Sequence, residues 1–176
     1  MKRLLIVVDY QNDFVNGTLG FDGAELLERR IAEKICAYRQ NNDDVTFTLD
    51  THEENYLSTQ EGKNLPIPHC IKNTDGGRLF GTIAALRKDT DRCFEKPTFG
   101  SDGLYEWLKT TDYTSIELVG LVSNICVISN AVLAKTALPE AEIIIDASCT
   151  AAADTAINKA ALDVMSGLQM KVINRI

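Results

Sequence analysis

The sequence predicts an α/β protein with a three-layer α/β/α architecture. In this doubly wound, Rossmann-like arrangement, a mainly parallel six-stranded sheet lies between two layers of helices. Short apolar stretches alternate with longer stretches of helical periodicity, which is typical of strands joined by crossover helices. The right-handed crossover rule then places helices on both faces of the sheet. The length of 176 residues fits a single domain over 1–176.

Six short stretches are interpreted as strands, and five of them contain apolar β-branched residues. We expect strands at 4–8, 45–49, 91–94, 116–119, 142–145 and 170–173. The first is a continuous apolar run, as expected for a strand that is covered on both faces of a parallel sheet. A loop rich in Asn, Asp and Gly follows it at 10–22.

Helical spacing of apolar residues fills most of the sequence between these strands. We expect helices at 23–40, 81–86, 102–109 and 156–167, and another that begins at Cys126 and ends before Pro139. Asp22 is placed to cap the first helix. The apolar side chains of that helix share one face: Leu26, Leu27, Ile31, Ile35 and Tyr38.

Composition narrows the classes of partner and the cellular compartment. The net charge is −7 without a basic cluster, which argues against nucleic acid or an anionic membrane as a partner. The apolar run near the N-terminus is too short for a signal peptide, and no segment reaches transmembrane length. We therefore expect a cytoplasmic protein. Its five cysteines, an odd count, are expected to be free thiols.

Four residues whose side chains can take part in catalysis or bind a metal follow four of the predicted strands. Asp9 follows the first strand, Asp50 the second and Lys96 the third, while Cys126 lies just beyond the fourth. Ligands of such sheets bind beyond the carboxyl ends of the strands. The topology therefore predicts that these four residues meet at one edge of the sheet.

Asp9, Lys96 and Cys126 together suggest nucleophilic catalysis. An ammonium group and a helix N-terminus favour a thiolate, and a carboxylate can move the proton of the thiol. Backbone N–H groups in the turn 120–126 can hold an oxyanion. Each residue also has an ordinary structural interpretation: a buried thiol, a carboxylate that stabilises a loop and a solvated lysine.

The long polar segment 51–77 contains both histidines, and loops of this length are usually functional or disordered. Asp50 and His52 are two residues apart in an extended segment, so both can reach one ion. His69 and Glu61 could complete a zinc or iron site, with Glu61 the weakest candidate. The alternative is a pair of surface-loop histidines.

Two phenylalanines lie in loops at the same edge of the predicted sheet. Phe14 and Phe99 are placed to stack on a planar substrate, with loop packing as the alternative.

Five segments in order along nearly the whole chain resemble those of the isochorismatase-like cysteine hydrolases, and of their nicotinamidase branch in particular. They are 7–14 (VVDYQNDF), 50–53 (DTHE), 68–70 (PHC), 95–101 (EKPTFGS) and 120–127 (GLVSNICV). The resemblance implies the isochorismatase-like hydrolase fold. It also implies an enzyme that cleaves a small-molecule amide C–N bond through a thioester.

The resemblance implies roles for the catalytic residues. Asp9 would be the general base and acid, Lys96 the cation beside the thiolate, and Cys126 the nucleophile. The backbone N–H groups of Val122 and Cys126 would form the oxyanion hole, commonly with a cis peptide bond between Leu121 and Val122. Phe14, Leu121 and Val122 would contact the substrate.

The resemblance also implies a divalent metal. Its ligands would be Asp50, His52 and His69, with Glu61 as the fourth, and the metal is expected to be zinc, with iron or manganese as alternatives. The family often assembles into dimers or larger oligomers, so a homo-oligomer is expected.

Nicotinamide, hydrolysed to nicotinate and ammonia, is the leading substrate. Nicotinamidases commonly carry an aromatic residue three positions before the second metal histidine, where this chain has Pro66. A carbamoyl or ureido compound is therefore an alternative substrate. Two further hypotheses are a catalytically silent binding protein of the same fold and a zinc hydrolase that uses a metal-bound hydroxide.

Overall fold

The computed structural model describes residues 2–175 and contains one six-stranded sheet in which every pair of neighbouring strands is parallel. The spatial order of the strands is β3-β2-β1-β4-β5-β6. Their bounds are β1 Arg3–Val8, β2 Asp44–Asp50, β3 Cys93–Lys96, β4 Ser115–Leu121, β5 Glu142–Ala151 and β6 Lys171–Ile173. The prediction of a doubly wound parallel sheet is confirmed.

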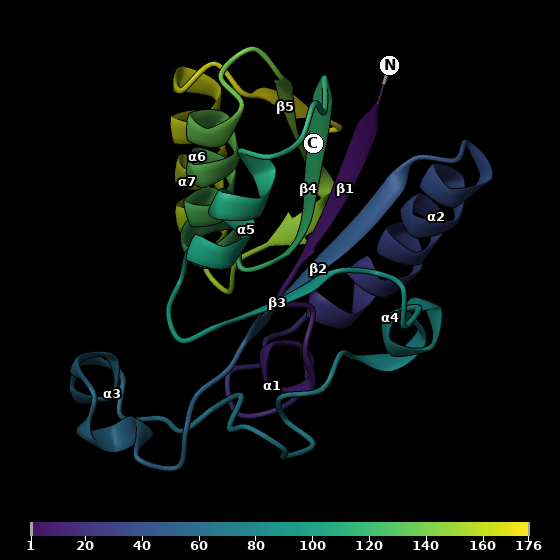
Figure 1. The fold of residues 1–176 in the computed structure, drawn as a ribbon. Coiled ribbons are helices and arrows are strands. Elements are labelled where there is room, and N and C mark those ends of the chain that lie inside the picture. Colours follow the sequence, from purple (N-terminus) through teal and green to yellow (C-terminus); the bar gives the residue numbers. More distant parts are fainter. Residues whose placement is uncertain (1, 176) are drawn as a thin grey trace.

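Helices cover both faces of the sheet (Figure 1). One face carries α2 (Leu27–Gln40) and α4 (Gly81–Leu86), and the other carries α5 (Asp102–Leu108), α6 (Ile128–Ala137) and α7 (Thr155–Gly167). Each face encloses its own hydrophobic core. None of the helices within residues 2–175 is both long enough and apolar enough to span a membrane.

Strand β1 lies at the centre of the sheet and divides the two cores. Leu4, Ile6 and Val8 pack into the core beneath α5, α6 and α7, while Leu5 and Val7 pack into the core beneath α2. All five side chains are fully buried. This explains the uninterrupted apolar run in the sequence, because both faces of the strand are covered.

The chain changes direction across the sheet after β3. From β1 it proceeds outward through β2 to β3, and then returns to form β4 on the other side of β1. Val8, the last residue of β1, is paired with Thr48 of β2 and with Gly120 of β4. The carboxyl ends of β1, β2 and β4 therefore form a topological switch point, where such sheets bind ligands.

Helix α2 begins later than predicted. A 3-10 turn, η1 (Ala24–Leu26), precedes it, and neither η1 nor α2 has a side-chain cap, so the predicted cap by Asp22 is wrong. Gly23 is the N-cap residue of this turn and has φ 92°, a left-handed conformation that glycine adopts without steric strain. The turn leaves Leu26 70% exposed, whereas Leu27 is buried.

The segment 51–77 and two strands also differ from prediction. The segment contains short helices, η2 (Tyr56–Ser58) and α3 (Gln60–Asn64), and α1 (Asn12–Val15) interrupts the first loop. Strand β3 begins two residues later than predicted. Strand β5 continues to Ala151 because an irregularity lets it rejoin β4: Leu118 pairs with Ile145, but Gly120 pairs with Thr150.

Candidate active site

Three side chains predicted to act together meet beyond the carboxyl ends of the strands. The Nζ of Lys96 lies 2.6 Å from Oδ2 of Asp9 and 3.6 Å from Sγ of Cys126. The side chains of Asp9 and Lys96 are fully buried, and Cys126 is 4% exposed. The ordinary interpretation of Lys96 as a solvated lysine is therefore wrong.

The backbone delivers these groups from three different strands. Asp9 directly follows β1 and has φ 45°, a left-handed conformation that is uncommon for a residue other than glycine. Its Oδ1 accepts a hydrogen bond of 2.6 Å from Oγ1 of Thr48 on β2. Lys96 is the last residue of β3, and its Nζ also donates to the carbonyl oxygen of Thr98 at 2.9 Å.

Cys126 lies in a wide π-type turn, η3 (Ser123–Val127), which leads directly into α6. The peptide bond between Leu121 and Val122 is cis, as the family resemblance implied. Gly120 has φ 110°, and a Cβ at this position would clash with the backbone of Val8. Only glycine therefore fits at this point of β4, where it pairs with Val8 at the end of β1.

Burial and charge act on the protonation of the three groups in different directions. Burial raises the pKa of Cys126 well above its usual value, Asp9 adds to the rise, and Lys96 opposes it. Burial also raises the pKa of Asp9 against the effect of Lys96. Burial lowers the pKa of Lys96, but Asp9, Cys126 and Asp50 outweigh it and hold Lys96 charged. The raised pKa means that the thiol of Cys126 needs a base to remove its proton, which is the role that the family resemblance implies for Asp9.

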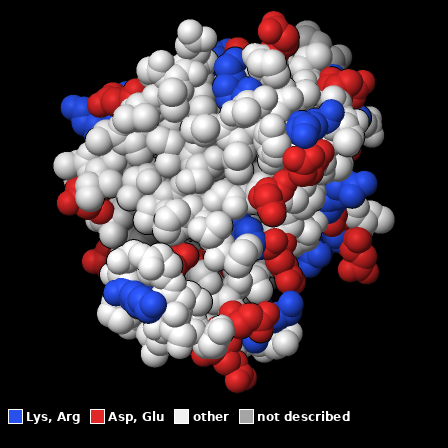
Figure 2. Space-filling model, turned by 60° about the vertical axis from the view of Figure 1, so that its left-hand side comes forward, with Lys and Arg blue, Asp and Glu red and all other residues white. Residues whose placement is uncertain are grey.

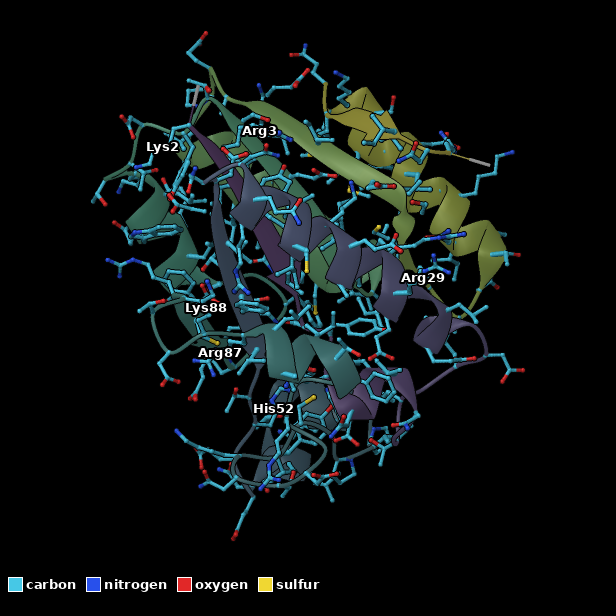
Figure 3. The ribbon with its side chains drawn as sticks, turned by 90° about the vertical axis from the view of Figure 1, so that its right-hand side faces the viewer. Lys2, Arg3, Arg29, His52, Arg87 and Lys88 are labelled. Atoms are coloured by element: carbon cyan, nitrogen blue, oxygen red, sulfur yellow. The ribbon has the colours of Figure 1, made fainter. Side chains whose placement is uncertain are left out.

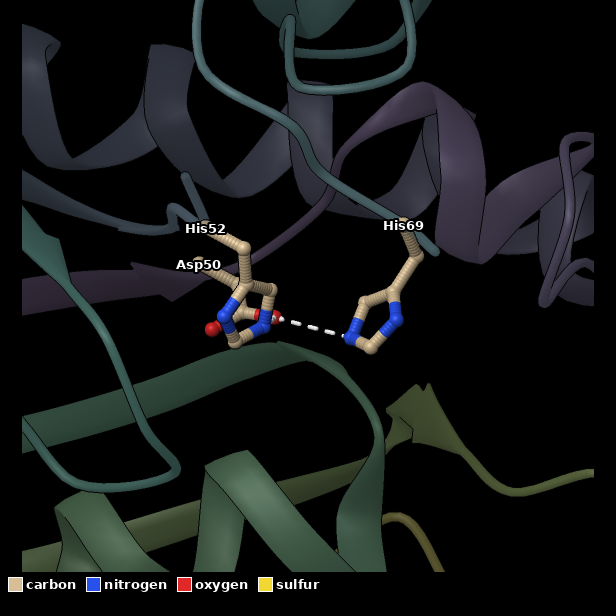
Figure 4. A group of neighbouring side chains, drawn as sticks. All are labelled: Asp50, His52 and His69. Carbon is tan, nitrogen blue, oxygen red and sulfur yellow. Dashed lines mark hydrogen bonds and ion pairs between the residues drawn. The ribbon is translucent and has the colours of Figure 1, made fainter. Parts of the chain in front are cut away.

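A second group of side chains adjoins the first. Asp50, His52 and His69 each offer a ligand atom, and these atoms lie within 4.8 Å of one another (Figure 4). The Oδ2 of Asp50 is 3.0 Å from Nε2 of His52 and 3.3 Å from Nε2 of His69. All three residues are buried, so the interpretation as surface-loop histidines is wrong.

This donor set fits a divalent transition metal. The Nδ1 of His69 lies 2.8 Å from the carbonyl oxygen of Ile67, which can only accept, so Nδ1 carries a proton and Nε2 is the ring nitrogen that would bind a metal. Two imidazole nitrogens and a carboxylate oxygen are ligands that zinc and iron accept. The Oε1 of Glu61 lies 3.7 Å from Nε2 of both histidines but is not among the donor atoms that converge with Asp50.

Asp50 joins the two groups. Its Oδ1 lies 3.4 Å from Nζ of Lys96, while its Oδ2 faces the histidines. Burial raises the pKa of Asp50, but hydrogen bonds from His52 and His69 and the charge of Lys96 outweigh this and lower it. Figure 3 shows His52 at the opposite end of the molecule from Lys2 and Arg3, beyond the carboxyl ends of the strands.

Aromatic rings surround the histidines. The ring of Phe14 is 5.6 Å from that of His69, and the ring of Tyr56 is 4.7 Å from His52 and 5.0 Å from His69. Tyr56 is buried and was not identified from the sequence, where a single tyrosine in a polar segment carries no distinguishing pattern. Phe99 lies on the loop after Lys96 and is 44% exposed.

Two buried carboxamides were also missed. Gln11 bonds the backbone of Asp50, and Asn130 bonds the backbone of Cys126. An isolated Gln or Asn gives no sequence signal of this kind. A polar residue among the apolar residues of 126–138 was the only available indication for Asn130.

The family model described as the isochorismatase domain matches residues 3–175. The chain belongs to the isochorismatase family. This isochorismatase-family hydrolase is 31% identical over 144 residues to "Uncharacterized isochorismatase family protein PncA" of Bacillus subtilis, an alignment that covers 75% of this chain and 78% of the relative.

Solved structures show the same fold. The crystal structure of nicotinamidase PncA from Bacillus subtilis has a TM-score of 0.85 and 28% identity, covering 98% of this isochorismatase-family chain and 99% of the other. The pyrazinamidase of Pyrococcus horikoshii in complex with zinc has a TM-score of 0.86 and 21% identity, covering 99% and 100% of the two chains. The second likeness, at this lower identity, shows the fold alone.

Proposed function

We propose that the protein is a cysteine amidohydrolase that cleaves a small-molecule amide C–N bond, with nicotinamide as the leading substrate. The observation that carries the proposal is the position of the Lys96 ammonium group, 2.6 Å from Asp9 and 3.6 Å from the sulfur of Cys126. A thiol, a carboxylate and a cation in a buried cluster are the groups that nucleophilic cleavage of an amide requires.

The first half of the reaction forms a thioester. Asp9 removes the proton of the Cys126 thiol, and the thiolate, stabilised by Lys96, attacks the amide carbonyl carbon. The backbone N–H groups of Val122 and Cys126 hold the oxyanion of the tetrahedral intermediate. When the C–N bond breaks, Asp9 returns the proton to the leaving nitrogen, and ammonia departs.

The second half regenerates the thiol. Asp9, again a carboxylate, removes a proton from water as the water oxygen attacks the thioester carbonyl. The C–S bond breaks, the acid product is released, and the proton on Asp9 returns to the sulfur of Cys126. The raised pKa of Cys126 makes this return favourable, because the buried sulfur holds a proton tightly.

Asp50, His52, His69 and Glu61 would hold a divalent metal, and zinc is the ion that we propose because imidazole and carboxylate ligands suit it. When bound, such an ion supplies a Lewis acid that can take the lone pair of a pyridine nitrogen or of water. The protein supplies the orientation: Ile67 fixes the tautomer of His69, and Tyr56 packs against both imidazole rings.

Phe14 is the side chain that we propose to stack on a planar substrate, because its ring packs near His69, a proposed metal ligand. Leu121 and Val122 are proposed to border the same space, beside Cys126. Pro66 is exposed and provides no aromatic face, which favours a carbamoyl or ureido compound as the second candidate substrate.

The deciding experiment measures ammonia release from nicotinamide and from a panel of small amides and ureido compounds, with metal content determined on the same sample. Nicotinamide turnover that is lost in Cys126→Ala and kept in Cys36→Ala, a change at an exposed thiol, is the expected result. Preference for a ureido compound would change the proposed substrate but leave the proposed mechanism in place. Activity that survives Cys126→Ala but is lost on chelation would replace the mechanism by metal-hydroxide chemistry.

We propose that two copies associate through the uncharged face of α6 and α7. Figure 2 shows a broad surface without charged side chains on the side of the molecule where these helices lie. Exposed apolar residues on the two helices are Val132, Ile157 and Val164. Because the chain carries a net charge of −7, this face lets two copies meet without opposing carboxylates. A monomeric mass by light scattering at all concentrations would contradict the proposal.

A further inference from the structure

Asn130 is a fully buried carboxamide in the first half of α6. Its Nδ2 donates to the carbonyl oxygens of Cys126 at 2.8 Å and Phe99 at 3.1 Å. Its Oδ1 accepts a hydrogen bond of 3.0 Å from the backbone N–H of Ser101. Burying an amide is costly unless its polar atoms are paired, and here both Nδ2 hydrogens and Oδ1 have partners.

These bonds join the segment that carries Cys126 to the loop 97–101, which follows Lys96. Within that loop, the carbonyl oxygen of Thr98 accepts a hydrogen bond of 2.9 Å from Nζ of Lys96. The loop that Asn130 holds therefore also holds the ammonium group. The contacts close a ring, since Nζ of Lys96 lies 3.6 Å from the sulfur of Cys126, and Cys126 bonds Asn130.

The loop lies directly against α6. A Cβ added to Gly100 would be 2.8 Å from Cδ1 of Leu133, so little space separates the two segments. Ser101, at the end of the loop, caps α5 through a hydrogen bond of 3.1 Å from the N–H of Leu104 to its Oγ. The two ends of the loop are thus fixed by β3 and α5, and Asn130 fixes its middle.

We propose that Asn130 is a positioning residue that sets the separation between the Lys96 ammonium group and the Cys126 sulfur. The inference rests on the proposed hydrolysis and adds to it a residue that touches neither the substrate nor the reacting atoms. Without the bonds to Phe99 and Ser101, the loop moves from α6, the carbonyl of Thr98 moves with it, and Lys96 turns toward its carboxylate partners Asp9 and Asp50.

Gln11 provides a matched comparison because it makes the same kind of clamp elsewhere in the site. Its Nε2 donates to the carbonyl oxygens of Asp50 at 2.8 Å and Gly77 at 2.9 Å, and its Oε1 accepts from the N–H of Asp50 at 2.8 Å. Gln11 is also fully buried. It holds the segment of a proposed metal ligand, whereas Asn130 holds the segment of the nucleophile.

The test uses Asn130→Ser as its main variant. A serine hydroxyl can still bond the carbonyl of Cys126 one turn earlier in the helix, but it is too short to hold the loop. Asn130→Asp is the second variant, which keeps the shape and replaces the donor by an acceptor that faces two carbonyl oxygens. Gln11→Glu makes the corresponding change on the other side of the site.

The readout is the rate at which iodoacetamide alkylates Cys126 across pH, followed by mass spectrometry of the peptide, in the metal-loaded protein. Both Asn130 variants are expected to move the midpoint of this profile upward by about one pH unit and to slow alkylation about tenfold at neutral pH. They should lower kcat by a similar factor with KM changed less than about twofold. Gln11→Glu should instead reduce bound metal.

A thermal melt of each variant separates positioning from folding. Variants that fold and show the wild-type alkylation profile would overturn the proposal, even if their melting temperature is lower. The alkylation assay needs no substrate. If the Asn130 variants alter the alkylation profile but the wild-type protein hydrolyses no amide, the positioning role stands and the proposed function is refuted. If the wild-type protein hydrolyses amides but the variants leave the profile unchanged, the proposed function stands and the positioning role is refuted.

Discussion

Asp50 and Lys96 are register partners on the neighbouring parallel strands β2 and β3, and their side chains lie 3.4 Å apart at Oδ1 and Nζ. The second oxygen of Asp50 faces His52 and His69. One carboxylate thus connects the proposed metal site to the proposed nucleophile. A change of charge on either side acts on the other through a single buried residue, because charges interact strongly where water is excluded.

Lys96→Met should destabilise the protein. The substitution leaves the carboxylates of Asp9 and Asp50 buried without their cation, and breaking a buried ion pair in this way costs about 3–5 kcal/mol. Urea denaturation followed by circular dichroism measures the loss. Lys159→Met, a change at an exposed lysine, should alter the free energy of unfolding by no more than about 0.5 kcal/mol. Equal effects of the two substitutions would show that the ion pairs of Lys96 contribute nothing to the free energy of unfolding.

His52→Ala should reduce the metal bound after purification and dialysis, because it removes one of three converging donor atoms. Removal of a metal ligand is expected to weaken binding by at least about tenfold to a hundredfold. Elemental analysis and titration with zinc measure the change. Glu61→Gln should reduce metal binding less, since the Glu61 carboxylate is farther from both imidazoles than the Asp50 carboxylate is. Undiminished zinc binding in His52→Ala would exclude this site.

Gly120→Ala should be strongly destabilising. The residue has φ 110°, and the added methyl group would strike the backbone of Val8 in the central strand, so we expect a loss of about 3 kcal/mol or more. Gly167→Ala is the matched control, because a Cβ there meets no atom within 4 Å and the residue ends α7. The control should be neutral or stabilising by up to about 1 kcal/mol. Similar melting temperatures for the two variants would contradict the steric argument.

Acid should weaken the ion pair between Asp146 and Lys34, which lies away from the proposed active site. Burial raises the pKa of Asp146, but hydrogen bonds from Lys34 and Ser148 outweigh this and hold it below its usual value. A depressed folded-state pKa contributes stability above the unfolded value of about 3.9, and the contribution is lost as the pH falls through the folded-state value.

The measurement for Asp146 is the free energy of unfolding between pH 6 and 2. Wild type should exceed Asp146→Asn in stability at pH 6, and the difference should shrink as the pH falls below about 4. A difference that stays constant across this range would show that ionisation of Asp146 makes no contribution. Activity per folded molecule at pH 6 should be unchanged by the substitution, because the hydrogen-bond and ion-pair partners of Asp146 within residues 2–175 are Lys34, Ser148 and Asn174, none of which is a proposed catalytic residue.

The sequence was sufficient to predict the sheet and the meeting of Asp9, Asp50, Lys96 and Cys126. Apolar runs identify buried strands, and parallel topology brings their carboxyl ends together. The motif resemblance, rather than spacing, predicted the cis peptide bond at Val122.

The clamps by Gln11 and Asn130 and the packing of Tyr56 could not be predicted in this way. Each depends on where a segment distant in the sequence arrives, as when Phe99 reaches Asn130. The burial that raises the pKa of Cys126 could not be predicted either. A helix N-terminus and a lysine are visible in a sequence, but the depth of burial that outweighs them is not.

The irregular pairing of β4 with β5 has a consequence for changes in chain length. Between the pair Leu118–Ile145 and the pair Gly120–Thr150, β5 advances five residues while β4 advances two. Relatives of this protein should therefore tolerate substitutions in the surplus segment far better than deletions. Losing one residue there would move Thr150 out of register with Gly120, at the end of β4 that leads into the turn of Cys126. Such a deletion should therefore disturb the proposed site although it removes none of the proposed catalytic residues.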